Sequence, residues 1–392
     1  MRIYFDHNAT TPVEPSVAET MSSALVSTFG NPSSVHHFGQ QAKKLIDEAR
    51  TAVAELLGAR PSEVVFTSGG TESDNLAIRG VGELAATTNH RCHLITSAIE
   101  HDAVLKTVTT LGKRTGWRCT ILPVNNQGLV SPKQLADVID DETSIVSVMH
   151  ANNEIGTIQP IRELAAIAHD HGAIVHVDGA QSAPHMPINV NQLECDLFSF
   201  SLHKMLGPTG VGALWGREEI LSELEPICAG GGTVESASAE HYSLRPIPDR
   251  LEGGLGHYAG ICGTEAALDL LAQYDMRDMA EQEVRVNRIM SDGIKHLPGV
   301  EIIGPENAAM RGGICSILLE NLDVQNVGIL MDEVSSVFVR SGLHCVNQWF
   351  DARGIEQGSL RASAYAYNTE EEARCFVDTF NEIIEGLTGE SA

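Results

Sequence analysis

The chain has 392 residues, of which 43% are hydrophobic and 20% are charged, as in an ordinary soluble globular protein with one large and one smaller domain or two of similar size. Its formal net charge of -26 repels nucleic acid and acidic membrane surfaces, so neither is an expected partner. No apolar run is long enough to span a membrane, and the opening MRIYFDHNATTP lacks a signal-peptide layout, so we expect a cytoplasmic protein. Eight scattered cysteines without CxxC pairs indicate neither a disulfide framework nor a zinc site, and no metal site is expected.

The spacing of apolar residues predicts a short strand over 3–12, followed by helices over 13–29 and 36–57. Beyond them strands alternate with helices. The predicted strands are 64–67, 93–97, 118–123, 145–149, 173–177 and the apolar run before Lys204, and the predicted helices run through 76–78 and over 101–115 and 162–171. This alternation predicts an α/β fold with a largely parallel sheet and helices on both of its faces.

From about residue 258 the pattern changes. A long helical segment over 261–297 precedes short strands around 300–303, 314–318 and 337–339 and a final helix over 370–387, an α+β layout that predicts a smaller C-terminal domain. In parallel sheets, ligands gather at the carboxyl ends of the strands. The polar side chains that fall at these ends are His101, Asn153, Asp178, Gln181, Ser201, His203 and Lys204.

The stretch SFSLHKMLGPTGVG, residues 199–212, places Lys204 between a Ser/His pair and a glycine-rich turn. A lysine at a strand end is usually just a solvated charge. Here Ser201 and His203 offer hydrogen bonds to an anion, and the glycines allow a sharp turn around a ligand. Since a desolvated lysine is a nucleophile toward aldehydes, we hypothesise that Lys204 forms a Schiff base with pyridoxal phosphate.

The segment SGGTESDN, residues 68–75, directly follows a predicted strand and opens a helix. A strand, a glycine turn and a helix N-terminus present free N–H groups and a positive dipole end to a phosphate, here around Gly70 and Thr71. A simple capping box of Thr71 and Asp74 is the alternative. The independent donors Ser201 and His203 favour the phosphate site.

Four further residues have a role available in such a site. Asp178 ends the apolar run AIVHVD and either caps the next turn or keeps the pyridine nitrogen of the cofactor protonated, so that the ring acts as an electron sink. His101 either belongs to the first turn of a helix or stacks on the cofactor ring and moves protons. Gln181 and Asn153 are either loop amides or ligands of the cofactor's phenolic oxygen and of the substrate.

Several motifs run along nearly the whole chain: DHNATTP, GNPSSVHHFG, FTSGGTESDN, EHDAV, HANNEIG, HVDGAQS, SFSLHK, RSGLHC and SLRASAYAYNTEEE. As a set they resemble the fold-type I pyridoxal phosphate enzymes of the class V aminotransferase group, and within it the cysteine desulfurases of the NifS, IscS and SufS type. The resemblance implies a large domain over 13–257, with a mostly parallel seven-stranded sheet between helices, and a small domain formed by 1–12 and 258–392. It also implies a homodimer that converts L-cysteine to L-alanine and passes sulfur to an acceptor or scaffold protein, as in iron–sulfur cluster assembly.

The resemblance also carries roles over to single residues. These roles are the Schiff-base lysine for Lys204, the stacking histidine for His101, the ring-nitrogen partner for Asp178, the phenolate contact for Gln181, phosphate ligands for Thr71, Ser201 and His203, and the substrate-carboxylate site for Asn153 and Arg361. Arg361 suits a carboxylate because its planar guanidinium binds one bidentately.

Cys345 matches the catalytic cysteine of the family. It lies in the polar loop RSGLHC beside Arg340 and His344, surroundings that favour the thiolate, whereas the other cysteines are expected to be buried and inert. In the implied mechanism the freed Lys204 removes the Cα proton of bound L-cysteine and Cys345 attacks the substrate sulfur. Alanine is released, and Cys345 carries a persulfide.

Three departures keep alternatives open. Leu202 stands where the family usually has glycine, which would alter the turn beside the phosphate, and Leu255 stands where it has a threonine that reaches the phosphate of the partner subunit. The N-terminal half resembles the NifS/IscS branch, but RSGLHC and the C-terminal motif resemble the SufS branch. A selenocysteine lyase, a C–S lyase or an epimerase therefore remains an alternative. So does a non-catalytic dimer, against which the intact set of Lys204, Asp178 and His101 argues.

Overall fold

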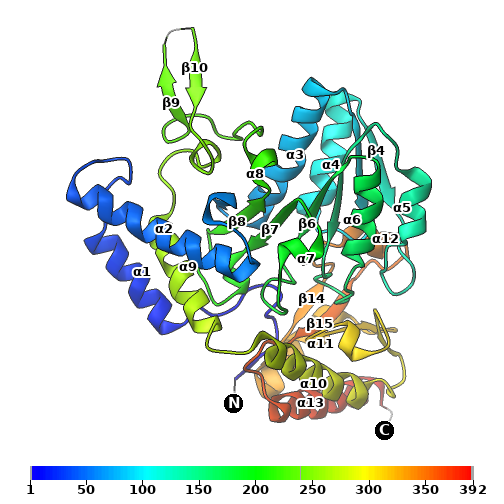
Figure 1. The fold of residues 1–392 in the computed structure, drawn as a ribbon. Coiled ribbons are helices and arrows are strands. Elements are labelled where there is room, and N and C mark those ends of the chain that lie inside the picture. The colour runs from blue at the N-terminus through cyan, green and yellow to red at the C-terminus, as the bar shows by residue number, and fades with distance from the viewer. Residues whose placement is uncertain (1, 239, 390–392) are drawn as a thin grey trace.

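The computed structural model describes residues 2–238 and 240–389. Its largest element is a seven-stranded sheet in the order β2-β8-β7-β6-β5-β3-β4 (Figure 1). Strands β4, β3, β5, β6 and β7 pair in parallel, and only β8, between β7 and β2, runs against its neighbours in this sheet. The predicted α/β fold with a mostly parallel sheet is therefore confirmed.

The strands of this sheet are short and almost completely buried, as expected for a sheet that helices cover on both faces. They are β2 Val64–Thr67, β3 His93–Ser97, β4 Arg118–Leu122, β5 Thr143–Met149, β6 Ile174–Asp178, β7 Leu197–Ser201 and β8 Gly212–Gly216. The helices between them are α3 Gly70–Thr88, α4 Asp102–Thr115, α5 Pro132–Val138, α6 Ile161–Asp170 and α7 Val190–Leu193. The predicted strands 64–67, 93–97, 118–123, 145–149 and 173–177 and the predicted helices 101–115 and 162–171 agree with these bounds to within two residues, whereas β8 and α7 were not predicted.

Helices α1 (Pro15–Ser27), α2 (His37–Leu57) and α9 (Tyr258–Leu271) pack against one another beside the large sheet (Figure 1). The single helical segment predicted over 261–297 is wrong, because α9 ends at Leu271 and α10 (Met276–Ile294) begins after a turn. Asp275 caps α10 by accepting a hydrogen bond from the N–H of Arg277 at 2.7 Å. This local bond starts a new helix where apolar spacing alone continues the old one.

The C-terminal part contains a four-stranded antiparallel sheet in the order β11-β12-β15-β14. Its strands are β11 Val300–Ile302, β12 Ile314–Leu319, β14 Arg340–Gly342 and β15 Ser359–Ser363. Helices α10, α11 (Val324–Ser335) and α13 (Glu370–Thr388) pack with it (Figure 1). Strand β1 (Ile3–Tyr4) pairs with β13 (Val337–Phe338), so the N-terminus joins the C-terminal part.

We propose a large domain around the seven-stranded sheet and a small domain around the four-stranded sheet. The pairing of β1 with β13 supports the assignment of residues 1–12 to the small domain. Ile261 and Leu268 of α9, however, lie in the same hydrophobic core as the large sheet. We therefore place the second boundary in the turn between α9 and α10, and not at the expected 257/258.

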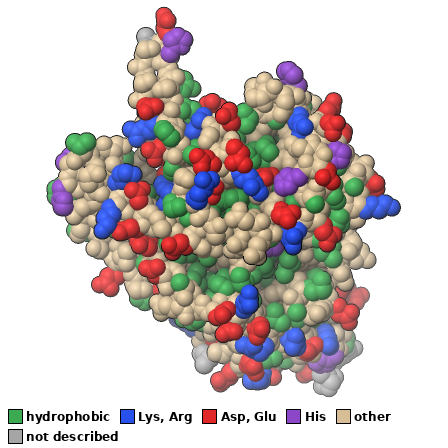
Figure 2. All heavy atoms as spheres, in the orientation of Figure 1, with side chains coloured by type: hydrophobic (Ala, Val, Ile, Leu, Met, Phe, Trp, Pro, Cys, Tyr) green, Lys and Arg blue, Asp and Glu red, His purple; other side chains and the backbone are tan. Residues whose placement is uncertain are grey.

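Acidic and basic side chains are interspersed over the face of the molecule in Figure 2. A hairpin of β9 (Val234–Ala237) and β10 (Tyr242–Leu244) projects away from the body (Figure 1). Within residues 2–238 and 240–389, no helix is long and apolar enough to cross a membrane. The same residues contain no group of three or more His, Cys, Asp or Glu side chains arranged to hold a metal ion.

Candidate active site

A cavity of about 570 Å³ lies at the carboxyl ends of the parallel strands, and residues of the C-terminal part line it as well. The structure brings all the predicted site residues to this one cavity: Gly70, Thr71, His101, Asn153, Asp178, Gln181, Ser201, His203, Lys204, Cys345 and Arg361. They come from segments that are up to about 300 residues apart in the sequence, so only the fold brings them together.

Lys204 ends a single 3-10 turn, Leu202–Lys204, that directly follows β7. Burial lowers the pKa of Lys204 to about 8, and the positive charge of Arg361 acts in the same direction, whereas Asp178 opposes both. A large share of the amine is therefore unprotonated slightly above neutral pH. This is the form in which a lysine is a nucleophile.

The N-terminal motif DHNATTP holds this turn in place. The hydroxyls of Thr10 and Thr11 donate to the backbone carbonyl of His203 at 3.1 and 3.0 Å, and the Thr11 hydroxyl accepts from the N–H of Leu206 at 2.8 Å. Burial lowers the pKa of His203 to about 4, so its ring is neutral. The N-terminal segment is thus a strap across the lysine turn, a role that the sequence did not reveal.

The turn before α3 forms a tight backbone cradle. A Cβ on Gly70 would lie 2.9 Å from the hydroxyl oxygen of Ser201, and a Cβ on Gly212 would lie 2.5 Å from the backbone of Gly69. The N–H of Gly70 donates to this Ser201 hydroxyl at 2.7 Å. The alternative capping box of Thr71 and Asp74 is absent, because the N-cap of α3 is Gly69, which makes no side-chain cap. Gly69, Gly70 and Thr71 line the cavity together with Ser201, so the cavity lies at a helix N-terminus, where an anion is favoured.

Two carboxyl groups lie at this end of the sheet. Asp178 accepts a hydrogen bond from the N–H of Ala180 at 2.9 Å, so it caps the turn as well as facing the cavity. Asp74, also in the cavity wall, is completely buried, and burial together with the charge of Asp178 raises its pKa well above the ordinary value. Burial and the neighbouring carboxylate thus favour the protonated form of Asp74. From the sequence Asp74 was expected to be only a capping residue, although an acidic side chain on the buried face of a helix was a signal for a larger role.

His101 caps α4: its Nδ1 accepts a hydrogen bond from the N–H of Ala103 at 3.1 Å. Burial and the charge of Lys204 lower the pKa of His101, so the ring is neutral and its proton is on Nε2. Glu100 braces the same corner by accepting from the N–H of Met149, and burial raises its pKa to about 8. The structure thus places His101 at the head of α4, and the capping bond fixes the ring that lines the cavity.

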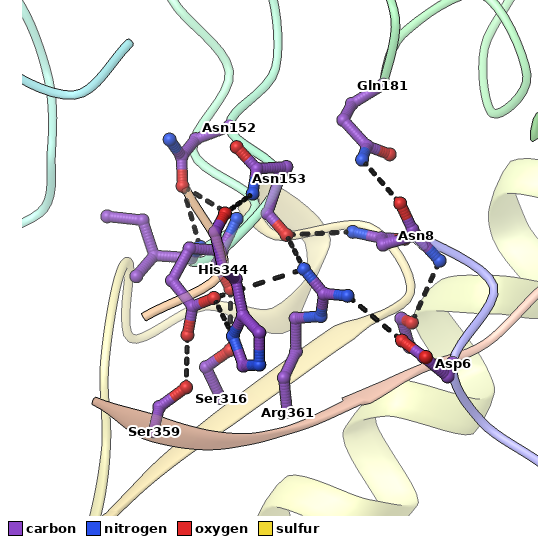
Figure 3. Close-up of polar contacts among 12 residues, drawn as sticks. Asp6, Asn8, Asn152, Asn153, Gln181, Ser316, His344, Ser359 and Arg361 are labelled. Carbon is purple, nitrogen blue, oxygen red and sulfur yellow. Dashed lines mark hydrogen bonds and ion pairs between the residues drawn. The ribbon is translucent and has the colours of Figure 1, made fainter. Parts of the chain in front are cut away.

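A chain of amides leads from the large sheet toward Arg361 (Figure 3). Gln181 Nε2 donates to the carbonyl of Asn8 at 3.1 Å, and Asn8 Nδ2 donates to the carbonyl of Asn153 at 3.1 Å. Gln181 Oε1 and Asn153 Oδ1 are buried, and within the described residues they have no hydrogen-bond partner. Buried polar atoms rarely stay unpaired, so these two oxygens indicate that a polar ligand completes the site.

Arg361 is almost completely buried, at 1% exposure. Its Nη1 donates to the carbonyl of Asn153 at 2.8 Å, and its Nη2 donates to Asp6 Oδ1 at 3.0 Å (Figure 3). Its Nε is buried without a partner among the described residues. The guanidinium is therefore fixed in one orientation in the cavity wall.

Cys345 is exposed and lines the cavity. Arg340 and His344 line it too, but the His344 imidazole is bonded to Glu154, with 2.6 Å between Nδ1 and Oε2. All eight cysteines are free thiols. The expectation that most of the others are buried is wrong: only Cys195, Cys262 and Cys315 are buried, and Cys228 is exposed.

The two leucines that depart from the family pattern lie in different surroundings. Leu202 is fully buried in the core of the large sheet, so the lysine turn accommodates its side chain. Gly207 provides the space, because a Cβ there would lie 2.8 Å from the Leu202 carbonyl oxygen. Leu255 is 60% exposed and lines a second cavity that shares Ser68 and Gly210 with the first.

Residues 3–376 match the family model for aminotransferase class-V. The chain belongs to the class-V aminotransferase family. It is 36% identical over 395 residues to a cysteine desulfurase IscS of Dictyoglomus turgidum, which covers 98% of this chain and 95% of that relative. A cysteine desulfurase of Haloferax volcanii is 34% identical over 388 residues, covering 97% and 88%. The apo structure of cysteine desulfurase from Thermococcus onnurineus NA1 gives a TM-score of 0.92 at 32% identity, covering 98% and 95%.

The enzymes of this class-V family use pyridoxal phosphate, which is the cofactor of this chain, and the cavity fits it. The lysine has a lowered pKa, a carboxylate faces the cavity at Asp178, and the N-terminus of α3 lines the cavity at Gly70 and Thr71. The unpaired oxygens of Gln181 and Asn153 are consistent with a polar ligand that is bound during function.

Proposed function

We propose that the chain is a pyridoxal phosphate-dependent cysteine desulfurase, which converts L-cysteine to L-alanine and keeps the sulfur on Cys345 as a persulfide. The observation that carries the proposal is the single cavity that Lys204, Asp178, Arg361 and the exposed Cys345 line together. A lyase that releases sulfide directly has no need for an accessible cysteine opposite the lysine. The names of the relatives support the same activity.

The cofactor-binding roles are proposals for this chain. Lys204 would carry the cofactor covalently, His101 would stack on its ring, and Asp178 would pair with its ring nitrogen. Its other contacts would be made by Gly70, Thr71, Ser201 and His203 at the phosphate, by Gln181 at the phenolic oxygen and by Asn153 beside the substrate. The bound cofactor supplies an electron sink that stabilises negative charge at the substrate Cα.

The side chains of the protein perform the remaining steps. Arg361 binds the substrate carboxylate through its planar guanidinium, and Lys204, whose pKa burial lowers to about 8, takes the proton from Cα. The thiolate of Cys345 attacks the substrate sulfur, so that a sulfur–sulfur bond forms while the bond between Cβ and sulfur breaks. Protons return to Cα and Cβ, alanine leaves, and Cys345 holds the transferred sulfur.

The proposed function also includes a sulfur acceptor, an oligomeric state and a cellular location. The persulfide passes to an acceptor or scaffold protein, because Cys345 is exposed. The protein is a homodimer that works in the cytoplasm. The exposed apolar side chains of Leu25, Val26, Phe29 and Val35 support self-association, since exposed apolar patches are typical of interfaces.

The decisive experiment incubates the protein with L-cysteine, with and without a thiol reductant, and measures alanine and sulfide. We expect alanine from the wild type and none from Cys345→Ala, which keeps the near-visible absorbance band of the cofactor. Lys204→Ala loses that band. Alanine at the wild-type rate from Cys345→Ala would refute the persulfide mechanism, and pyruvate in place of alanine would favour the C–S lyase.

A further inference from the structure

The loop that carries Cys345 lies between β14 and α12 (Asn347–Asp351) and is strained. His344 and Cys345 have φ angles of +46° and +64°, in the left-handed region that residues other than glycine rarely adopt. The N–H of Val346 donates to the carbonyl of Leu343 at 2.9 Å and closes the turn. Such a backbone persists only where surrounding contacts hold it. The contacts of His344 therefore decide where the neighbouring thiol lies.

Two consecutive residues of the loop after β5 hold His344. Asn153 Nδ2 donates to the His344 carbonyl at 2.8 Å (Figure 3), and His344 Nδ1 lies 2.6 Å from Glu154 Oε2. Burial raises the pKa of Glu154, but the hydrogen bond and charge of His344, followed by Arg361, bring it below its ordinary value. Glu154 is thus ionised, and His344 Nδ1 donates the bond. Because the two side chains are only 2% and 0% exposed, water does not weaken this charged bond.

Glu154 is fixed independently of His344. Its N–H donates to Asn152 Oδ1 at 2.9 Å, and its carbonyl accepts from the Ser316 hydroxyl at 2.6 Å. The Ser359 hydroxyl donates to its carboxylate. Figure 3 shows these side chains gathered around the His344 ring. Glu154 therefore has supports that do not depend on the Cys345 loop.

We propose that Glu154 is a positioning residue for Cys345: with His344 it forms a latch that holds the loop in its left-handed conformation, with the thiol at the cavity wall. The inference rests on the proposed function, in which Cys345 accepts the substrate sulfur. Arg361 donates to the carbonyl of Asn153 at 2.8 Å and to Asp6 Oδ1 at 3.0 Å, and it lies 4.0 Å from Glu154 Oε2. Asn153 and Asp6 thus hold the group that binds the substrate, and the latch acts on the thiol.

The test uses the cofactor-loaded protein and its variants His344→Gln and Glu154→Gln, each of which keeps a polar side chain of similar size. Three quantities are measured. They are alanine formation from L-cysteine with its kcat and KM, exchange of the α-hydrogen of L-alanine with deuterium oxide, and the rate at which iodoacetamide alkylates Cys345, mapped by mass spectrometry. Only the first and the third depend on the position of the thiol.

For both variants we expect kcat to fall about 10- to 100-fold, because misplacing a reacting group by roughly 1 Å has an effect of this size. KM and the α-deuterium exchange stay within about twofold of the wild type, since neither uses the thiol. Alkylation of Cys345 becomes at least about threefold faster, because a released loop exposes the thiol more often.

The matched control is His185→Gln, which breaks another buried histidine–glutamate pair. His185 Nδ1 lies 2.9 Å from Glu283 Oε2, with side chains 12% and 1% exposed. His185 lies outside the lining of the main cavity, so this variant keeps wild-type alkylation and kcat even if it lowers the melting temperature.

Wild-type alkylation and kcat in both loop variants would overturn the latch. So would equal effects in the His185 control, which would indicate general destabilisation, or a parallel loss of α-deuterium exchange, which would indicate damage to the cofactor site. A wild type that exchanges deuterium but forms no alanine would instead refute the proposed function. The alkylation rates would still decide whether Glu154 holds the loop.

Discussion

Lys204 and Cys345 line one cavity but stand on different supports. Lys204 directly follows β7, which β6 and β8 flank inside the seven-stranded sheet, and backbone bonds on both sides fix its turn. Cys345 follows β14, the edge strand of the four-stranded sheet, and side chains hold its loop. The lysine is therefore held by the interior of the sheet, by backbone hydrogen bonds and by the hydroxyls of Thr10 and Thr11. The cysteine, which must pass sulfur outward, depends on a few side-chain contacts at a sheet edge.

The largest effect on the reaction rate is expected at Asp178, which follows a strand of the seven-stranded sheet. Asp178→Asn should lower alanine formation by about 100- to 1,000-fold, the usual effect of removing one preorganised electrostatic group. Asp74→Asn is the matched control, because burial and Asp178 raise the pKa of Asp74, so the amide replaces a carboxyl whose uncharged form is favoured. Steady-state kinetics of both variants measure the effect. Equal losses in the two would mean that the charge of Asp178 is not what matters.

Replacement of Arg361, which lines the cavity from the C-terminal part, should change KM. Arg361→Lys is expected to raise KM for L-cysteine by about 10- to 100-fold, since an ammonium cannot replace two parallel hydrogen bonds to a carboxylate. Arg340→Lys is the control, because Arg340 lines the cavity but is exposed. Initial rates over a range of substrate concentrations separate KM from kcat. An unchanged KM in Arg361→Lys would place the substrate carboxylate elsewhere.

The protonation of the Lys204 amine should determine how the rate of cofactor attachment depends on pH. Since burial lowers its pKa to about 8, the amine is protonated below that pH and free above it. Attachment of pyridoxal phosphate to the apo-protein should therefore quicken about tenfold per pH unit below pH 8 and level off above it. Absorbance after rapid mixing follows the reaction. Free Nα-acetyl-lysine is the reference, and a plateau only near its much higher pKa would contradict the burial of Lys204.

The smallest effect is a loss of stability, expected when the N-terminal strap across the lysine turn is weakened. Thr11→Val leaves the buried N–H of Leu206 without its partner and should cost about 1–3 kcal/mol of unfolding free energy. Each kcal/mol corresponds to about 2–4 °C in the melting temperature of a domain of this size. Thr20→Val, on an exposed face of α1, is the control. Equal melting temperatures for the two variants would show that the Thr11 hydroxyl does not stabilise the lysine turn.

The comparison also explains what the sequence could predict. The site residues of the large sheet were predictable because each parallel strand brings its polar residue to the same edge, as Asp178 and Lys204 illustrate. Strand β14 was missed because it has only three residues. Strand β15, which carries Arg361, was missed because polar residues interrupt its apolar pattern although all five residues are buried. The bond between Glu154 and His344 joins residues 190 positions apart, and no local pattern reveals such a pair. The raised pKa of Asp74 was hidden for a similar reason, because burial and the distant Asp178 cause it.

The strap has a consequence for the synthesis of the protein. The N–H of Asn8 donates to the hydroxyl of Ser363, which lies 355 residues later in the chain. Strand β1 likewise pairs with the distant strand β13. These residues therefore find their partners only after synthesis has passed Ser363. Until then Thr10 and Thr11 lack the anchor that holds them across the lysine turn. The nascent chain should acquire its capacity to bind the cofactor only after that point.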